Sequence, residues 1–159
     1  MGGGLILSAE SDWITLCTGR ALIPGDAESI ALVLDEPISF WGGVDPGTGN
    51  IIDRRHPQLS ECVRGKILAM PSGRGSSSSS SVLAECVRAG TAPSAILLAE
   101  PDQILVLGAL VAEELYDRTV PILVVSDEQL RRIPEHARLR IRDHGMASDA
   151  TIELFWRAS

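Results

Sequence analysis

The sequence lacks any apolar run that approaches the roughly 20 residues a membrane-spanning helix needs. The short run Leu5–Leu7 is too brief for the core of a signal peptide. Position 6 is Ile6, where an N-myristoylation signal has Ser or Thr. These absences predict a cytoplasmic protein with no membrane among its partners.

Positive charge is also scarce, because 14 Lys and Arg face 21 Asp and Glu, for a net charge of -7. A general nucleic-acid binder needs the opposite balance to replace phosphate counterions. One basic stretch, Arg131–Arg142, holds five arginines, but Glu135 interrupts it and Asp143 follows it directly. We interpret it as a solvated face and expect no nucleic-acid partner.

Cysteine and histidine are few, and their spacing does not suit a metal. No Cys-x-x-Cys pair occurs, and no two histidines stand four apart on a helix. The residues concerned are Cys17, Cys62, Cys86, His56, His136 and His144. We therefore expect reduced, mostly buried thiols and no metal or cofactor on this chain.

The chain has the composition of an ordered globular protein. Its 159 residues are 45% hydrophobic and 22% charged, enough to build one core. We predict a single domain over residues 1–159, with residues 1–10 forming a loose N-terminus. The six consecutive serines are the only segment of low complexity.

The order of patterns predicts an α/β fold. Extended segments are expected at 12–22, 29–45 and 49–53, and the short turns between them suggest antiparallel pairing. Strand and helix then alternate: strand 66–71, helix 82–90, strand 94–100, a helix over 101–117 with Pro101 at its start, and strand 119–127. This alternation indicates a parallel sheet with right-handed crossovers. Strands at 137–143 and 149–156 complete a mixed sheet or barrel-like β region with flanking helices.

The stretch GRGSSSSSS, Gly73–Ser81, reads either as a flexible linker or as a functional site. It lies between a buried strand and a helix, so its length is that of one loop plus one helical turn, and serine is a good helix N-cap. Gly73 and Gly75 allow the backbone to approach a ligand, while a helix start offers N–H groups to an anion. No Lys follows the second glycine, so this is not a Walker motif.

Three segments carry a resemblance to a known family: SFWGGVDPGTGNIIDRRHP, GKILAMPSGRGSSSSSSVL and AILLAEPDQILVLGALVAEELY. Over about residues 32–125 the chain resembles the small, swivelling domain of the aconitase X family. The resemblance implies a β/β/α domain that closes over the substrate of a large subunit carrying iron or an iron–sulfur cluster. It also implies a hydro-lyase in which Ser76 is the catalytic base, Ser77 lies beside a substrate carboxylate, and Arg74 and Gly75 complete the substrate-binding loop.

The chain departs from aconitases directly after the two serines, where Arg-Glu-His is replaced by Ser78, Ser79 and Ser80. The resemblance then favours a substrate with one carboxylate bound from this side, and cis-3-hydroxy-L-proline in particular. A small subunit of phosphomevalonate dehydratase is the alternative, and a non-catalytic module that binds an anion or a partner is a third.

An aromatic residue followed by glycines precedes the turn at residues 45–50. Trp41 is most simply interpreted as core or interface packing, and Gly42 and Gly43 as a turn. A rigid aromatic beside flexible glycines also suits a surface that closes on a partner. Trp41, Gly42 and Gly43 are therefore candidates for contact with the large subunit.

Overall fold

The computed structural model describes residues 12–145 and 149–157, so the expected loose segment at 1–10 lies outside the described residues. Its strands are β1 (Trp13–Ile23), β2 (Ala27–Val33), β3 (Ile67–Met70), β4 (Ala95–Leu98), β5 (Ile122–Val124), β6 (Arg138–Asp143) and β7 (Asp149–Phe155). Its helices are α1 (Phe40–Gly43), α2 (Ser79–Ala89), α3 (Gln103–Tyr116) and α4 (Asp127–Arg131). The seven strands form a closed barrel in the order β1-β5-β4-β3-β2-β6-β7.

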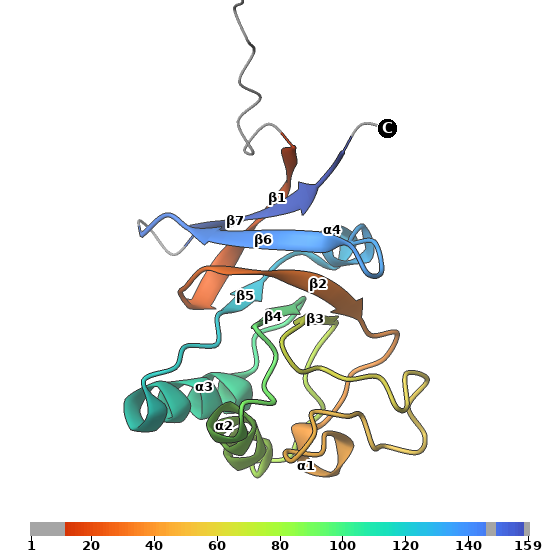
Figure 1. The fold of residues 1–159 in the computed structure, drawn as a ribbon, viewed down its shortest axis with the longest axis vertical. Helices are drawn as coiled ribbons and strands as arrows, with labels where there is room; N and C mark the ends of the chain where they lie inside the picture. The colour runs from red at the N-terminus through yellow and green to blue at the C-terminus, as the bar shows by residue number, and fades with distance from the viewer. Residues whose placement is uncertain (1–11, 146–148, 158–159) are drawn as a thin grey trace, which may run out of the picture.

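The alternating half of the chain forms the parallel part of the barrel, as predicted. β3 runs parallel to both β2 and β4, and β4 runs parallel to β5. α2 and α3 are the crossovers between these strands, and Figure 1 shows both helices lying together on one side of the barrel. The loop that leaves β3 therefore leads directly to the first turn of α2.

The predicted antiparallel pairing among the early strands is wrong. β1 pairs with β5 and β7, whereas β2 pairs with β3 and β6. In the barrel order, at least two strands separate β1 from β2 in either direction. Residues 24–26 therefore carry the chain across the end of the barrel instead of folding β2 back beside β1.

Of the early segments predicted as extended, the end of 29–45 and the whole of 49–53 are not strands. Phe40–Gly43 forms the short turn α1, in which Trp41, with ψ 115°, and Gly42, with φ 73°, have non-helical dihedral angles. Residues 49–53 make only isolated bridges, Val44 with Ile51 and Asn50 with Cys62. These segments form turns because glycines interrupt their apolar pattern on both sides.

Side chains of the parallel strands are buried on both faces. In β3, Ile67 and Ala69 pack into the barrel interior, while Leu68 and Met70 pack against the helices. The four residues of β4 divide in the same way. This two-sided burial explains why these strands read as continuous apolar runs and not as alternating patterns.

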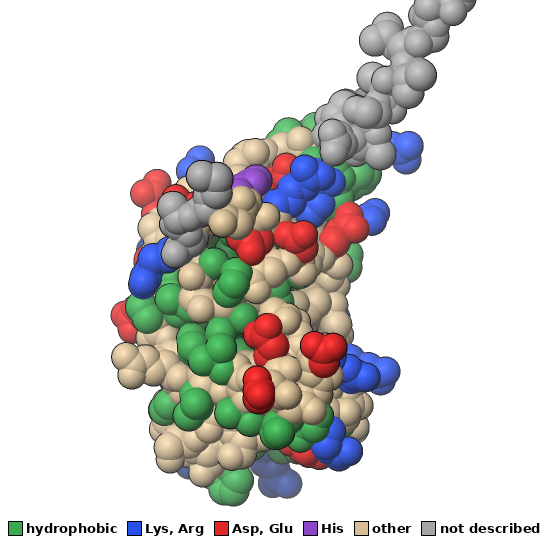
Figure 2. All heavy atoms as spheres, turned by 90° about the vertical axis from the view of Figure 1, so that its left-hand side faces the viewer, with side chains coloured by type: hydrophobic (Ala, Val, Ile, Leu, Met, Phe, Trp, Pro, Cys, Tyr) green, Lys and Arg blue, Asp and Glu red, His purple; other side chains and the backbone are tan. Residues whose placement is uncertain are grey.

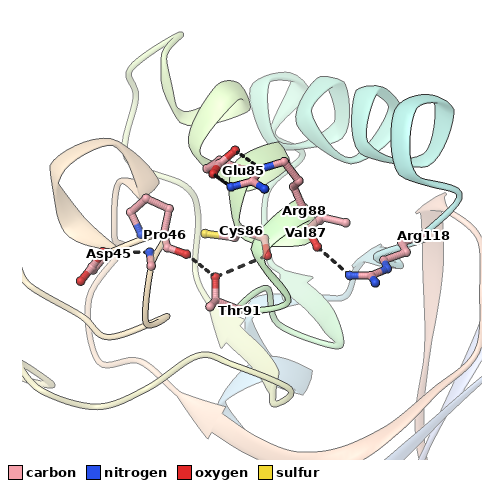
Figure 3. A network of polar contacts seen from close by, with 9 residues as sticks. Asp45, Pro46, Glu85, Cys86, Val87, Arg88, Thr91 and Arg118 are labelled. Carbon is pink, nitrogen blue, oxygen red and sulfur yellow. Dashed lines mark hydrogen bonds and ion pairs between the residues drawn. The ribbon is translucent and has the colours of Figure 1, made fainter.

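The C-terminal end of α2 is tied to its surroundings by the polar network in Figure 3. Thr91, 3% exposed, donates its hydroxyl proton to the carbonyl of Pro46 at 2.7 Å. Arg118 donates to the carbonyl of Val87 at 3.1 Å, and Gly90 ends the helix in the left-handed conformation. With this end anchored, α2 presents its first turn in a defined position.

Candidate functional site

The glycine and serine loop joins the end of β3 to the start of α2, as predicted, and Ser76 lies within it before the first helical residue, Ser79. The Ser76 hydroxyl oxygen accepts a hydrogen bond from the Ser78 backbone N–H at 3.3 Å. Its carbonyl accepts from the Ser79 N–H at 2.9 Å. Ser78 itself makes no side-chain cap, so the capping expected of a serine comes from Ser76, two residues earlier.

The predicted substrate-binding residues lie on the surface around Ser76. Arg74, Gly75 and Ser77 are exposed, and Ser76 is half-buried. The loop lines a cavity of only about 10 Å³, floored by Phe40 and other side chains beneath it. Small-molecule sites usually enclose about 300–1,000 Å³, so this cavity is far too small to enclose a substrate by itself.

Asp102 lies beneath the loop and was missed by the sequence reasoning. Its Oδ1 accepts hydrogen bonds from the N–H groups of Ile104 at 2.9 Å and Leu105 at 3.0 Å, and so caps α3. A Cβ atom on Gly73 would lie 1.8 Å from Oδ2 of Asp102. The helix begins after Asp102 and not at Pro101, and an Asp ahead of an apolar helix is the signal that identifies such a cap.

A second segment, residues 38–41, lies alongside the loop. Ile38 forms a parallel bridge with Gly73, and its carbonyl accepts from the Arg74 N–H at 3.2 Å. Ser79 is 4% exposed, and its hydroxyl accepts from the Trp41 N–H at 3.1 Å. Neither Ser79 nor this pairing was expected, because residues so distant in sequence give no local signal.

The candidate partner residues are divided by burial. The Trp41 side chain is 60% exposed, and Gly42 beside it is also exposed. Gly43 is buried, and a Cβ there would lie 2.8 Å from Cγ1 of Ile38. Of the three residues proposed for the interface, only Trp41 and Gly42 are accessible to a partner.

The first turn of α2 also packs closely on α3. A Cβ on Gly108 would lie 2.6 Å from the Ser80 carbonyl oxygen and 3.0 Å from its Cα. The glycine therefore permits the backbones of the two helices to approach. This contact fixes the turn that follows Ser76.

The arginines of the basic stretch are largely paired with carboxylates. Arg140 bonds to Glu153 at 2.6 Å, and Arg131 to Asp127 at 2.8 Å. Arg138 bonds to Glu28 at 3.2 Å. The pairs of Arg131 and Arg138 are exposed, as expected of a solvated face, whereas the side chains of Arg140 and Glu153 are only 18% and 15% exposed. Figure 2 shows how apolar and acidic side chains mix on the face of the molecule at the left of Figure 1.

Within residues 12–145 and 149–157, no three His, Cys, Asp or Glu side chains are grouped so as to hold a metal ion. The three cysteines are free thiols. Burial raises the pKa values of Cys17 and Cys86, which keeps both thiols protonated. None of the described helices has the length and apolar character needed to cross a membrane.

Two groups of curated proteins are similar to this chain. A cis-3-hydroxy-L-proline dehydratase of Pseudomonas aeruginosa is 49% identical over 112 residues, which are 70% of this chain and 19% of that protein. A phosphomevalonate dehydratase small subunit of Methanothermobacter thermautotrophicus is 42% identical over 93 residues, 58% of this chain and 71% of that protein. The chain thus spans about a fifth of the length of the first relative.

Among solved structures, aconitase X of Thermococcus kodakaraensis in its holo form matches with a TM-score of 0.73 and 29% identity. The match covers 86% of this chain and 98% of that chain. The family model described as the aconitase X swivel domain matches residues 16–149, which include the whole glycine and serine loop. The chain therefore belongs to the aconitase X swivel domain family.

Proposed function

We propose that this chain is the small, swivelling part of a two-part hydro-lyase and that Ser76 supplies the catalytic base. Dehydration beside a carboxylate removes a proton from one carbon and expels a hydroxyl from the next. In the proposed step, the Ser76 alkoxide takes the C–H proton. The electron pair of that bond forms the double bond as the hydroxyl leaves as hydroxide, which takes a proton from solvent to become water.

The loop offers groups that stabilise an anionic serine. A serine hydroxyl is a weak base unless its alkoxide is stabilised. Ser76 Oγ already accepts from the Ser78 N–H, and it stands at the positive end of the α2 dipole. Arg74 is exposed nearby and is the one basic side chain among the described residues that line the cavity. We assign Arg74, Gly75 and Ser77 to the substrate carboxylate.

The observation that carries the two-part proposal is the size of the cavity at Ser76. At about 10 Å³ it holds roughly one water molecule, so a substrate bound there needs a second wall. The exposed Trp41 and Gly42 border the same loop, and we propose that they contact the large part that supplies this wall.

The leaving hydroxyl requires a Lewis acid, which the family resemblance assigns to iron or an iron–sulfur cluster on the large part. The described residues of this chain provide no grouped ligands for such a centre. In this proposal, the metal centre of the large part would only draw the leaving hydroxyl away from the carbon. This chain contributes the base and part of the carboxylate site.

We propose cis-3-hydroxy-L-proline as the substrate. The relative named as its dehydratase in Pseudomonas aeruginosa shares 49% of aligned residues, against 42% for the phosphomevalonate dehydratase small subunit of Methanothermobacter thermautotrophicus. A phosphorylated substrate would also require more positive charge than Arg74 provides. The phosphomevalonate reaction remains the second candidate. This chain aligns with 71% of that small subunit, which is a separate chain of similar length.

The test mixes the purified chain with the large part of an aconitase X enzyme and measures dehydration of each substrate. We expect turnover of cis-3-hydroxy-L-proline by the mixture and none by this chain alone. Turnover by the isolated chain would contradict the two-part proposal. If the mixture turned over phosphomevalonate and not cis-3-hydroxy-L-proline, phosphomevalonate would be the substrate. If the two parts bound each other but turned over neither compound, the chain would instead be a non-catalytic binding module.

A further inference from the structure

Ser79 is buried although it belongs to a run of serines that is mostly exposed or half-buried. Its hydroxyl oxygen accepts a hydrogen bond from the Trp41 N–H at 3.1 Å and lies 3.1 Å from Oγ of Ser39. Both partners belong to the segment 38–41. A side chain that merely filled space would need no hydroxyl here, so the polar group serves the contact with that segment.

The segment 38–41 is joined to the loop on both sides of Ser76. Before Ser76, Ile38 bridges Gly73 and accepts from the Arg74 N–H. After it, Ser79 holds the backbone of Trp41. Ser76 is three residues from each of the outer contacts, at Gly73 and Ser79. Displacement of the segment therefore acts on both ends of the loop.

We propose that Ser79 is a positioning residue that couples the position of Trp41 to that of the loop bearing Ser76. The Trp41 indole is the exposed end of this connection, and Ser79 is its buried end. A partner that shifts or clamps the indole then also sets the loop. The inference rests on the proposed function for the role of Ser76, but the coupling itself is a property of this chain.

The first experiment measures amide hydrogen exchange in the isolated chain for Ser79→Ala and for the matched control Ser81→Ala, which alters an exposed serine in the same turn. For Ser79→Ala we expect exchange to rise severalfold in peptides covering both 39–43 and 73–78, with strand β4 unchanged. Ser81→Ala should leave both peptides as in the wild type. A rise confined to 39–43 would overturn the coupling.

A milder variant distinguishes the proposed coupling from general unfolding of the domain. Ser39→Ala removes one of the two contacts of the Ser79 hydroxyl and keeps the bond to Trp41. We expect a smaller rise in the same two peptides and an unchanged rate in β4. Two results together would mean that Ser79 only supports the fold. These are an unchanged exchange rate in the 73–78 peptide of Ser39→Ala and a raised exchange rate throughout the domain in Ser79→Ala.

The second experiment measures affinity for the large part in a double-mutant cycle. Ser79→Ala should weaken binding about tenfold in the wild-type background and less than twofold in the Trp41→Ala background, while the melting temperature falls equally in both. Equal losses of affinity in both backgrounds would overturn the proposal. An inactive wild-type mixture with the expected exchange result would reject the proposed function and leave the coupling in place.

Discussion

The serines from Ser76 to Ser81 are chemically identical, yet the structure gives them different tasks. Ser76 accepts a backbone N–H within the loop, and Ser79 is buried against the backbone of Trp41. Ser80 bonds back to the Ser77 carbonyl at 2.8 Å and lies under Gly108. A run of one residue type therefore contains separable roles that single substitutions can distinguish.

Ser76→Ala should lower turnover of the two-part enzyme by roughly a hundredfold or more, because it removes the proposed base. Loss of its bond to the Ser78 N–H should cost about 0.5–2 kcal/mol of unfolding free energy. Steady-state kinetics and thermal melting measure the two effects separately.

Ser80→Ala is the matched control, since its hydroxyl bonds to a carbonyl within its own turn. We expect nearly normal turnover from it. Equal losses for the two variants, or near-normal turnover of Ser76→Ala, would reduce Ser76 to a capping role.

Residue roles were predictable from the sequence only where a linear motif carries them. The loop position of Ser76 follows from a strand, two glycines and a helix in succession. The hydroxyl contact of Ser79 with Trp41 joins residues 38 positions apart, and no local pattern encodes it. Asp102 carries a recognisable cap signal in the sequence, but Pro101 beside it carries a competing signal for a helix start, and the structure begins the helix after Asp102.

At the scale of elements, the contact between α2 and α3 determines where the serine loop stands. The helices meet where Gly108 faces the backbone of Ser80. A methyl group there meets backbone atoms at 2.6–3.2 Å, and backbone cannot rotate aside as a flexible side chain does. The position therefore requires glycine for space and not for its dihedral angles.

Gly108→Ala should destabilise the domain although alanine favours helices over glycine by about 1 kcal/mol. The clash with Ser80 has to exceed that gain, and we expect a net loss of about 1–3 kcal/mol. Turnover in the two-part assay should fall as the first turn of α2 shifts. Chemical denaturation measures the first effect.

Glu114→Ala serves as the control, because it alters an exposed position of the same helix. It should leave both stability and turnover close to wild type. A more stable Gly108→Ala variant would show that the helices have room to separate.

The elements themselves are largely predictable, whereas the partners of the early strands are not. Apolar runs identified β3, β4 and β5, and the alternation with helices gave their parallel order. The sequence also indicates β1 and β2, although residues 49–53 are not a strand, and it does not indicate how β1 and β2 pair, because a turn at residues 24–26 is compatible with either a hairpin or a crossing. Closure of the barrel through β1 and β7 decides between them.

At the scale of the whole molecule, two cores share one sheet. Cys17 is buried in the barrel interior, and Cys86 is fully buried between the sheet and the helices. Cys62 is only half-buried, in the loop region outside both. The three thiols therefore report on separate regions of one domain.

In the folded chain near pH 8, a thiol reagent should modify Cys62 and spare Cys17 and Cys86. Burial raises the pKa values of Cys17 and Cys86 above that of an exposed thiol. The contribution of these two protonated thiols to the free energy of unfolding is therefore complete below the pKa of an exposed thiol and is lost as the pH rises through their own pKa values. Mass spectrometry of the labelled chain counts the modified thiols. Labelling of Cys86 ahead of Cys17 in mild denaturant would show that the two cores unfold separately.

The closed barrel determines how this domain behaves when it stands apart from any partner. Each of the seven strands pairs with two neighbours, so no described strand has an edge that is unpaired along its whole length, although residues 13–19 of β1 pair with β7 alone. A partner that extended this sheet would therefore have only part of a strand to pair with, and side chains and loops make up the rest of the surface. Repeated separation from a partner consequently exposes partial strand edges, and no complete strand, as a template for strand exchange or fibril growth.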